Sequence, residues 1–90
     1  MTPNDHAASR YVERVAAAVR DVAGLPAETQ LDATTRLVGG GLALDSVVLL
    51  EVSLALEAEF ACRIDEADLR PPHIDTIGSL AALIRGKSGG

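Results

Sequence analysis

Residues 41–60 read GLALDSVVLLEVSLALEAEF, and this stretch decides the fold. From Ser46 to Phe60 it is aliphatic and free of proline and glycine, which predicts a helix over those residues. Asp45 or Ser46 can cap this helix, because a short side-chain oxygen there accepts a hydrogen bond from a free N–H of the first turn. The apolar residues exceed one face of the helix. We therefore expect either an exposed patch that meets a partner or a middle helix packed on most sides.

Three further segments predict helices and complete an all-α fold. The first runs from about Ser9 to Ala23, with Ser9 as its N-cap and Gly24 just past its end. Its buried face consists of valines at helical spacing, namely Val12, Val15, Val19 and Val22. A short helical turn follows later at Asp65 to Leu69, and a last helix, capped by Asp75 or Thr76, ends near Gly86. We expect a four-helix bundle of three main helices and one short helix.

A long first loop, from Leu25 to Asp45, separates the first two main helices. Leucines recur along it and predict that the loop is held against the helical core, through Leu25, Leu31, Leu37, Leu42 and Leu44. A crossover from one end of the bundle to the other predicts that the first two helices run parallel. We place one domain at residues 9–85, between flexible tails at 1–8 and 86–90.

The composition argues against several classes of function. The chain has 13 acidic and 8 basic residues, for a net charge of −5, which disfavours binding to nucleic acid or to an anionic membrane. The single cysteine, Cys62, cannot form an internal disulfide and has no neighbouring Cys or His at metal-ligand spacing. No apolar run is long enough for a membrane span, and residues 1–9 lack an apolar export segment. We expect a cytoplasmic monomer without a metal site.

The sequence offers Ser46 no evident catalytic partner. A serine nucleophile needs a base within hydrogen-bond reach, and that base needs a third group to orient it. His6 lies in the expected tail, His73 follows a pair of prolines, and Cys62 has no activating neighbour. The glycines at 39–41 lack the Gly-Lys-Ser/Thr continuation of a phosphate-binding loop. We therefore expect no catalytic residue, and a minimal hydrolase using Ser46 or Cys62 is the least favoured alternative.

Four carboxylates lie in a window without basic residues, from Leu37 to Cys62. They are Asp45, Glu51, Glu57 and Glu59. Their spacing does not match a calcium-binding loop, which needs oxygen ligands at alternate positions. Two interpretations stay open: an ordinary solvated helix face, or a negative strip that steers basic partner proteins.

Several motifs occur together in a fixed order. They are Gly41-Leu42-Ala43-Leu44-Asp45-Ser46-Val47, then Glu51, then Leu56-Glu57-Ala58-Glu59-Phe60, then Ile64, and last Asp75-Thr76-Ile77-Gly78-Ser79-Leu80. This combination resembles the acyl carrier protein family, including the peptidyl carriers of nonribosomal synthesis. The resemblance covers roughly Val12 to Ile84.

The resemblance implies a covalent cofactor and a set of partners. Ser46 matches the serine that a phosphopantetheinyl transferase modifies, with coenzyme A as donor of the 4'-phosphopantetheine arm and Mg²⁺ as the transferase's metal. Asp45 matches the acidic residue before that serine, which helps to orient the transferase complex. An acyl- or aminoacyl-loading enzyme and downstream synthase or transferase enzymes are the further partners. We assign partner docking to Val47, Val48, Leu49, Glu51, Leu54 and Glu57.

Departures from the family pattern bear on the choice of partners. Val47 stands where the family usually has leucine or methionine, and Val48 and Leu49 stand where fatty-acid carriers often have polar or acidic residues. Residues 43–46 resemble an acyl carrier more than the Gly-Gly-His/Asp-Ser of peptidyl carriers. We expect a discrete, non-enzymatic carrier for polyketide, nonribosomal or related specialised biosynthesis. The alternative is an unmodified helical adaptor whose apolar patch binds a partner helix.

Overall fold

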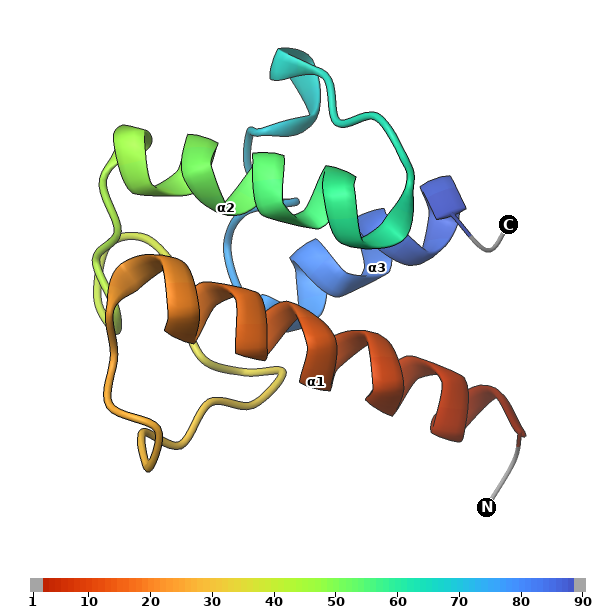
Figure 1. The fold of residues 1–90 in the computed structure, drawn as a ribbon, viewed down its shortest axis with the longest axis horizontal. Coiled ribbons are helices and arrows are strands. Elements are labelled where there is room, and N and C mark those ends of the chain that lie inside the picture. The colour runs from red at the N-terminus through yellow and green to blue at the C-terminus, as the bar shows by residue number, and fades with distance from the viewer. Residues whose placement is uncertain (1–2, 89–90) are drawn as a thin grey trace.

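Three α-helices and one short 3-10 helix form the fold of residues 3–88, the part of the chain described by the structure, a computed structural model. These elements are α1 (Pro3–Ala23), α2 (Ser46–Phe60), η1 (Glu66–Asp68) and α3 (Ile77–Ser88), as Figure 1 shows. The predicted all-α fold, with three main helices and one short helix, is confirmed. No helix within residues 3–88 combines the length and apolar character needed to cross a bilayer.

The observed bounds of α2 agree with the predicted ones, whereas α1 begins earlier and α3 ends later than predicted. Helix α2 begins and ends where it was predicted to. Helix α1 begins at Pro3, so Ser9 lies inside it and is not its N-cap. Proline suits a first helical position, because its missing N–H would have no partner there anyway. Helix α3 continues past Gly86 to Ser88. Residues 3–8 and 86–88, predicted to lie in tails, thus belong to helices, while residues 1–2 and 89–90 lie outside the described part.

Local hydrogen bonds explain where the helices stop and start. Gly24 has a positive φ of 68° and follows α1 directly, which is the backbone conformation that glycine adopts most readily after a helix. At the start of α3, the Ser79 amide donates to Thr76 Oγ1 at 3.0 Å, and the Thr76 amide donates to Ser79 Oγ at 3.0 Å. Of the two residues that could cap α3, Thr76 therefore does so.

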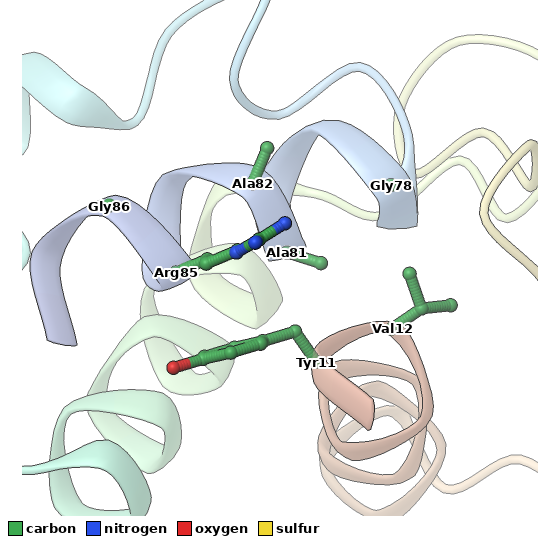
Figure 2. A pocket seen from close by; sticks show the side chains of 7 residues that line it. All are labelled: Tyr11, Val12, Gly78, Ala81, Ala82, Arg85 and Gly86. Carbon is green, nitrogen blue, oxygen red and sulfur yellow. The ribbon is translucent and has the colours of Figure 1, made fainter. Parts of the chain in front are cut away.

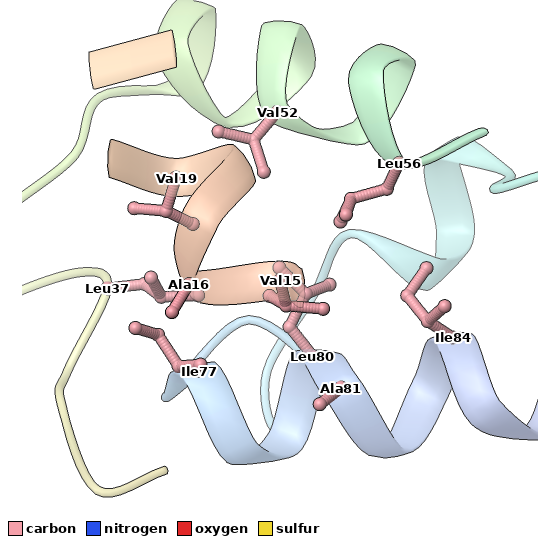
Figure 3. Close-up of a cluster of buried hydrophobic side chains, with 10 residues drawn as sticks. All are labelled: Val15, Ala16, Val19, Leu37, Val52, Leu56, Ile77, Leu80, Ala81 and Ile84. Carbon is pink, nitrogen blue, oxygen red and sulfur yellow. The ribbon is translucent and has the colours of Figure 1, made fainter. Parts of the chain in front are cut away.

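The core is aliphatic and draws on all three α-helices and the long loop (Figure 3). Its buried members are Val15, Ala16, Val19, Leu37, Val52, Leu56, Ile77, Leu80, Ala81 and Ile84. Full burial of each larger side chain contributes about 1.5–3 kcal/mol. Leu37 is the loop's fully buried residue, and three more leucines of the loop pack against the same cluster, namely Leu31, Leu42 and Leu44. The prediction that leucines hold the loop on the core is confirmed for these four.

Helix α1 runs antiparallel to both α2 and α3 (Figure 1). Tyr11, in the first half of α1, stacks on Phe60 at the end of α2 with ring centroids 5.4 Å apart. The Tyr11 hydroxyl also lies 3.2 Å from Ser88 Oγ at the end of α3. The prediction that the first two helices run parallel is therefore wrong.

The path of the long loop explains this direction. The loop reaches the start of α3, where the Leu37 amide donates to the Asp75 carbonyl at 2.9 Å. It then turns at residues 39–41 and returns, because the Leu44 amide donates to the Leu37 carbonyl at 2.8 Å. A loop that doubles back does not cross the bundle, so α2 starts near the end of α1 and runs in the opposite direction.

Candidate functional site

Ser46 is the first residue of α2, and it is exposed. The residue before it, Asp45, has extended backbone geometry and forms the N-cap: the Val48 amide donates to Asp45 Oδ1 at 2.9 Å. Such a cap contributes about 1 kcal/mol to stability. Because Asp45 does the capping, the hydroxyl of Ser46 is not needed for it.

The loop before α2 holds Ser46 in place through tight backbone packing. The Leu42 amide donates to the Arg36 carbonyl at 3.0 Å. Gly41 has a φ of 77°, and a Cβ there would lie 2.6 Å from the same Arg36 oxygen, so the turn requires glycine at this position. Ala43 also has a positive φ, of 51°, which is uncommon for a residue with a side chain. This constrained turn fixes the direction in which α2 begins.

An open groove of about 410 Å³ lies beside Ser46, between the first turns of α2 and the segment that contains η1. Its lining is Ser46, Val47, Leu49, Leu50, Glu66, Leu69 and Ile74. The lining is mostly aliphatic, and Glu66 is its one charged member. The groove therefore offers an apolar surface directly next to an exposed hydroxyl.

The four carboxylates of the basic-free window have different environments. Asp45 caps α2. Glu57 Oε2 accepts a hydrogen bond of 2.6 Å from the Ile64 amide, which holds the chain after α2. Glu59 pairs with Arg14 of α1 at 2.9 Å. Glu51 is exposed and forms no ion pair with any residue that the structure describes. The predicted negative strip is thus not uniform. Among the described side chains, Glu51 is the carboxylate of α2 that has no partner.

The residues predicted for docking also divide by exposure. Val47 is 65% exposed and Leu54 57% exposed. Val48 is half-buried against the core, and Leu49 is only 9% exposed, at the floor of the groove. The prediction omitted Leu50, which is 53% exposed. Its position, three residues after Val47 and four before Leu54, places it on their face and could have identified it.

Cys62 has no activating environment. The thiol is half-buried, and burial raises its pKa, as does the nearby carboxylate of Glu57. A raised pKa keeps the thiol protonated, whereas nucleophilic cysteines need a lowered one. Among the side chains that the structure describes, those of residues 10–88, no group of three or more His, Cys, Asp or Glu is arranged to hold a metal ion.

A second groove, of about 300 Å³, lies between α1 and α3 (Figure 2). Its lining is Tyr11, Val12, Gly78, Ala81, Ala82, Arg85 and Gly86. Small residues of α3 leave room beside α1, and Figure 2 shows the Arg85 side chain of α3 and the Tyr11 side chain of α1 extending along the same side of the groove. This groove shares no lining residue with the groove beside Ser46.

Residues 13–84 match the family model described as the phosphopantetheine attachment site. The chain belongs to this carrier protein family. The resemblance to acyl and peptidyl carriers is thereby confirmed, and covalent 4'-phosphopantetheine is the family's cofactor. The comparison with curated proteins found no match, and the comparison with solved structures found none either.

Membership of this carrier family has general consequences. Carrier domains are not catalytic themselves, and they interact with a phosphopantetheinyl transferase and with further partner enzymes. The residues around Ser46 fit the cofactor chemically, because an exposed hydroxyl starts a helix of 15 residues. The unpaired amides and the positive dipole end of such a helix favour an anionic phosphodiester.

Proposed function

We propose that this chain carries acyl or aminoacyl intermediates as thioesters on a phosphopantetheine arm attached to Ser46. The observation that carries the proposal is the exposed Ser46 hydroxyl at the start of α2, within the matched residues 13–84. The arm supplies the thiol that holds the cargo. Its tether raises the effective concentration of the cargo near the active sites of partner enzymes.

Attachment requires little chemistry from the carrier. The Ser46 oxygen forms a bond to the phosphorus of the phosphopantetheine group of coenzyme A. The bond from that phosphorus to the adenosine bisphosphate breaks, and the hydroxyl proton passes to a base of the transferase. The carrier therefore displays a hydroxyl without activating it, and we propose that the chain is not an enzyme. Asp45 serves the transferase complex indirectly, because it sets the first turn of α2.

The wider context forms part of the proposal. We assign partner docking to the exposed residues of α2, above all Val47, Leu54 and the newly identified Leu50. A loading enzyme and downstream synthase or transferase enzymes are the partners, in polyketide, nonribosomal or related specialised biosynthesis. The departures from the fatty-acid pattern at residues 47–49 support a dedicated pathway. We place the carrier domain at about residues 9–85, with the first turns of α1 and the last residues of α3 extending beyond these bounds. We expect a cytoplasmic monomer, in line with a lone cysteine that forms no internal disulfide.

Intact-mass measurement tests the attachment. The protein is incubated with coenzyme A, Mg²⁺ and a broad-specificity phosphopantetheinyl transferase. We expect one phosphopantetheinyl addition, lost in Ser46→Ala and kept in Ser88→Ala, a matched control at an exposed serine. No addition under conditions that modify a control carrier would contradict the proposal and favour the unmodified adaptor. Hydrolysis of an activated ester by the isolated chain, lost in Ser46→Ala, would instead favour a hydrolase.

A further inference from the structure

The groove between α1 and α3 lies far from Ser46. Its wall on α1 includes Tyr11, whose ring stacks on Phe60. Ser46 is the first and Phe60 the last residue of α2, a helix of 15 residues. At the usual helical rise these two ends lie about 21 Å apart. A molecule whose contact centres on the α1–α3 groove therefore leaves Ser46 uncovered.

The floor of this groove consists of small residues of α3. Gly78, Ala82 and Gly86 follow one another at intervals of four residues and form one row along the helix (Figure 2). A Cβ added at Gly86 would meet no atom within 4 Å, so the space above this residue is open. A row without large side chains allows another helix to approach α3 closely.

The wall on α1 is apolar and fixed in position. Tyr11 is held at its ring face by Phe60, with centroids 5.4 Å apart, and its hydroxyl lies 3.2 Å from Ser88 Oγ. Val12 lines the groove beside it. Because the wall is already ordered, binding of a ligand costs little conformational entropy on the side of the carrier. The volume of about 300 Å³ is sufficient for one apolar side chain from outside.

Arg85 sets the charge of the groove. It is half-buried, and it is the charged member of the lining. Two other cations of the fold have partners: Arg14 pairs with Glu59, and Lys87 pairs with Asp68. Arg85 forms no ion pair with any side chain of residues 10–88. Its guanidinium is therefore free to bind an anionic group from another molecule.

The helices differ in the sign of their charge. Helix α2 has three glutamates and no basic residue, whereas α3 has Arg85 and Lys87 and no acidic residue. On α1, the exposed Arg10 and Glu13 flank the two residues that line the groove, and their charges offset each other. The groove is thus a basic site on a protein whose net charge is −5. Such a site attracts an acidic partner.

We propose that the groove between α1 and α3 binds an acidic amphipathic helix of a partner protein. An apolar side chain of that helix fills the space above Gly86, and a neighbouring carboxylate pairs with Arg85, because a guanidinium matches a carboxylate in two parallel hydrogen bonds. This surface goes beyond the proposed function. It anchors the carrier to a partner while Ser46 stays accessible, and the binding itself needs no modified serine.

Chemical-shift mapping of the ¹⁵N-labelled carrier tests the proposal. The probe is a synthetic amidated helix of about three heptads, with leucine along one face and glutamate on both sides of it. The matched probe has lysine in place of glutamate. Each titration gives the Kd and the amides that shift. A parallel titration uses Ser46→Ala, which offers no serine for attachment.

Two variants alter the groove in different ways. Arg85→Gln removes the charge, and Gly86→Leu fills the open space while raising the helix propensity of α3. Arg63→Gln and Ala17→Leu are matched controls at exposed positions outside the groove. Thermal melts establish that each variant is folded.

We expect the acidic probe to bind with a Kd of about 0.1–1 mM and to shift amides of α1 and α3 around the groove. The basic probe should bind at least about tenfold more weakly. Arg85→Gln should weaken binding of the acidic probe about three- to tenfold, and Gly86→Leu at least about tenfold. The two control variants and Ser46→Ala should leave the Kd within about twofold.

Four results would overturn this inference. They are no binding of the acidic probe at about 1 mM, shifts confined to α2, equal binding of the two probes, and a Kd unchanged by both groove variants. Shifts of the groove amides with carrier concentration, in the absence of any probe, would assign the groove to a second copy of the chain instead. None of these results bears on attachment at Ser46, which the intact-mass measurement decides separately.

Discussion

The backbone amide of Gly78 donates a hydrogen bond of 2.9 Å to the carbonyl oxygen of Ala33. This contact joins the first turn of α3 to the long loop. It is extended by a bond of 3.0 Å from the Ile77 amide to the Thr35 carbonyl and by an antiparallel bridge between Arg36 and Thr76. The loop that positions Ser46 is thus held to α3 by its backbone as well as by its leucines.

Gly78→Ala is expected to destabilise the protein. A Cβ at Gly78 would lie 2.8 Å from the Ala33 oxygen, so the loop or the helix has to move. Overpacking of this kind costs about 1–3 kcal/mol. Gly86→Ala is the matched control in the same helix, because nothing lies within 4 Å of its added Cβ. It is expected to stabilise α3 by about 0.5–1 kcal/mol. Urea unfolding gives the free energy of unfolding of both variants. Equal changes in the two variants would contradict the close approach of the Ala33 carbonyl oxygen to Gly78.

Comparison of Asp45→Ala with Asp45→Asn separates two contributions of Asp45 to stability, the capping hydrogen bond from the Val48 amide and the negative charge. Asparagine accepts the Val48 amide as aspartate does, whereas alanine does not, so Asp45→Ala should lose about 1 kcal/mol and Asp45→Asn almost nothing. For a domain of this size, 1 kcal/mol lowers Tm by about 4–8 °C. Thermal melts give the comparison. An equal loss of Tm in both variants would show that the charge, not the hydrogen bond, stabilises α2.

The sequence was sufficient for features that depend on near neighbours. The bounds of α2 follow from a mainly aliphatic run without proline or glycine between Asp45 and Phe60. The sequence narrowed the cap of α3 to Asp75 or Thr76, and the bond from the Ser79 amide decides for Thr76. The family resemblance rests on such local motifs as well.

Features that depend on distant residues could not be read from the sequence. Glu59 pairs with Arg14, which lies 45 residues earlier, and no local pattern indicates this partner. The antiparallel course of α1 follows from backbone bonds between the loop and the start of α3, which apolar spacing does not encode. The sequence grouped Leu49 with its neighbours as a docking residue, but it is only 9% exposed and lies at the floor of the groove that Leu69 and Ile74 also line.

Glu57 and Glu51 are expected to respond differently to substitution, although the sequence grouped them as docking residues. Glu57→Ala removes the acceptor of the Ile64 amide, and a partly buried amide without a partner costs about 1–3 kcal/mol. Glu51→Ala removes an exposed carboxylate and should change stability by less than about 0.5 kcal/mol. Urea unfolding of the two variants tests this. Equal stability of both would mean that the Glu57 contact contributes nothing to the fold.

The ion pair between Asp68 and Lys87 predicts a specific dependence of stability on pH. It joins η1 to the end of α3 at 2.8 Å, and Asp68 Oδ2 also accepts from the Asp65 amide at 3.0 Å. The hydrogen bond from Lys87, followed by the one from the Asp65 amide, lowers the pKa of Asp68. The hydrogen bond to Asp68 raises the pKa of Lys87. Both shifts favour the charged forms in the folded protein.

Asp68→Asn is therefore expected to lower Tm at pH 7 and to change the acid limb of the stability curve. The Asp68 contribution is fully present above the ordinary pKa of about 4 and is lost as the pH falls through the lowered folded value. The Lys87 contribution is present below about pH 10.5 and is lost as the pH rises through its raised folded value.

Melts of both proteins from about pH 2 to pH 7 should give a Tm difference that is constant above about pH 5 and shrinks below about pH 4. The pKa of Asp32, lowered by hydrogen bonds from Thr34, affects both proteins alike and cancels in the comparison. A Tm difference that persists unchanged down to pH 2 would show that the Asp68 carboxylate is not stabilised by Lys87.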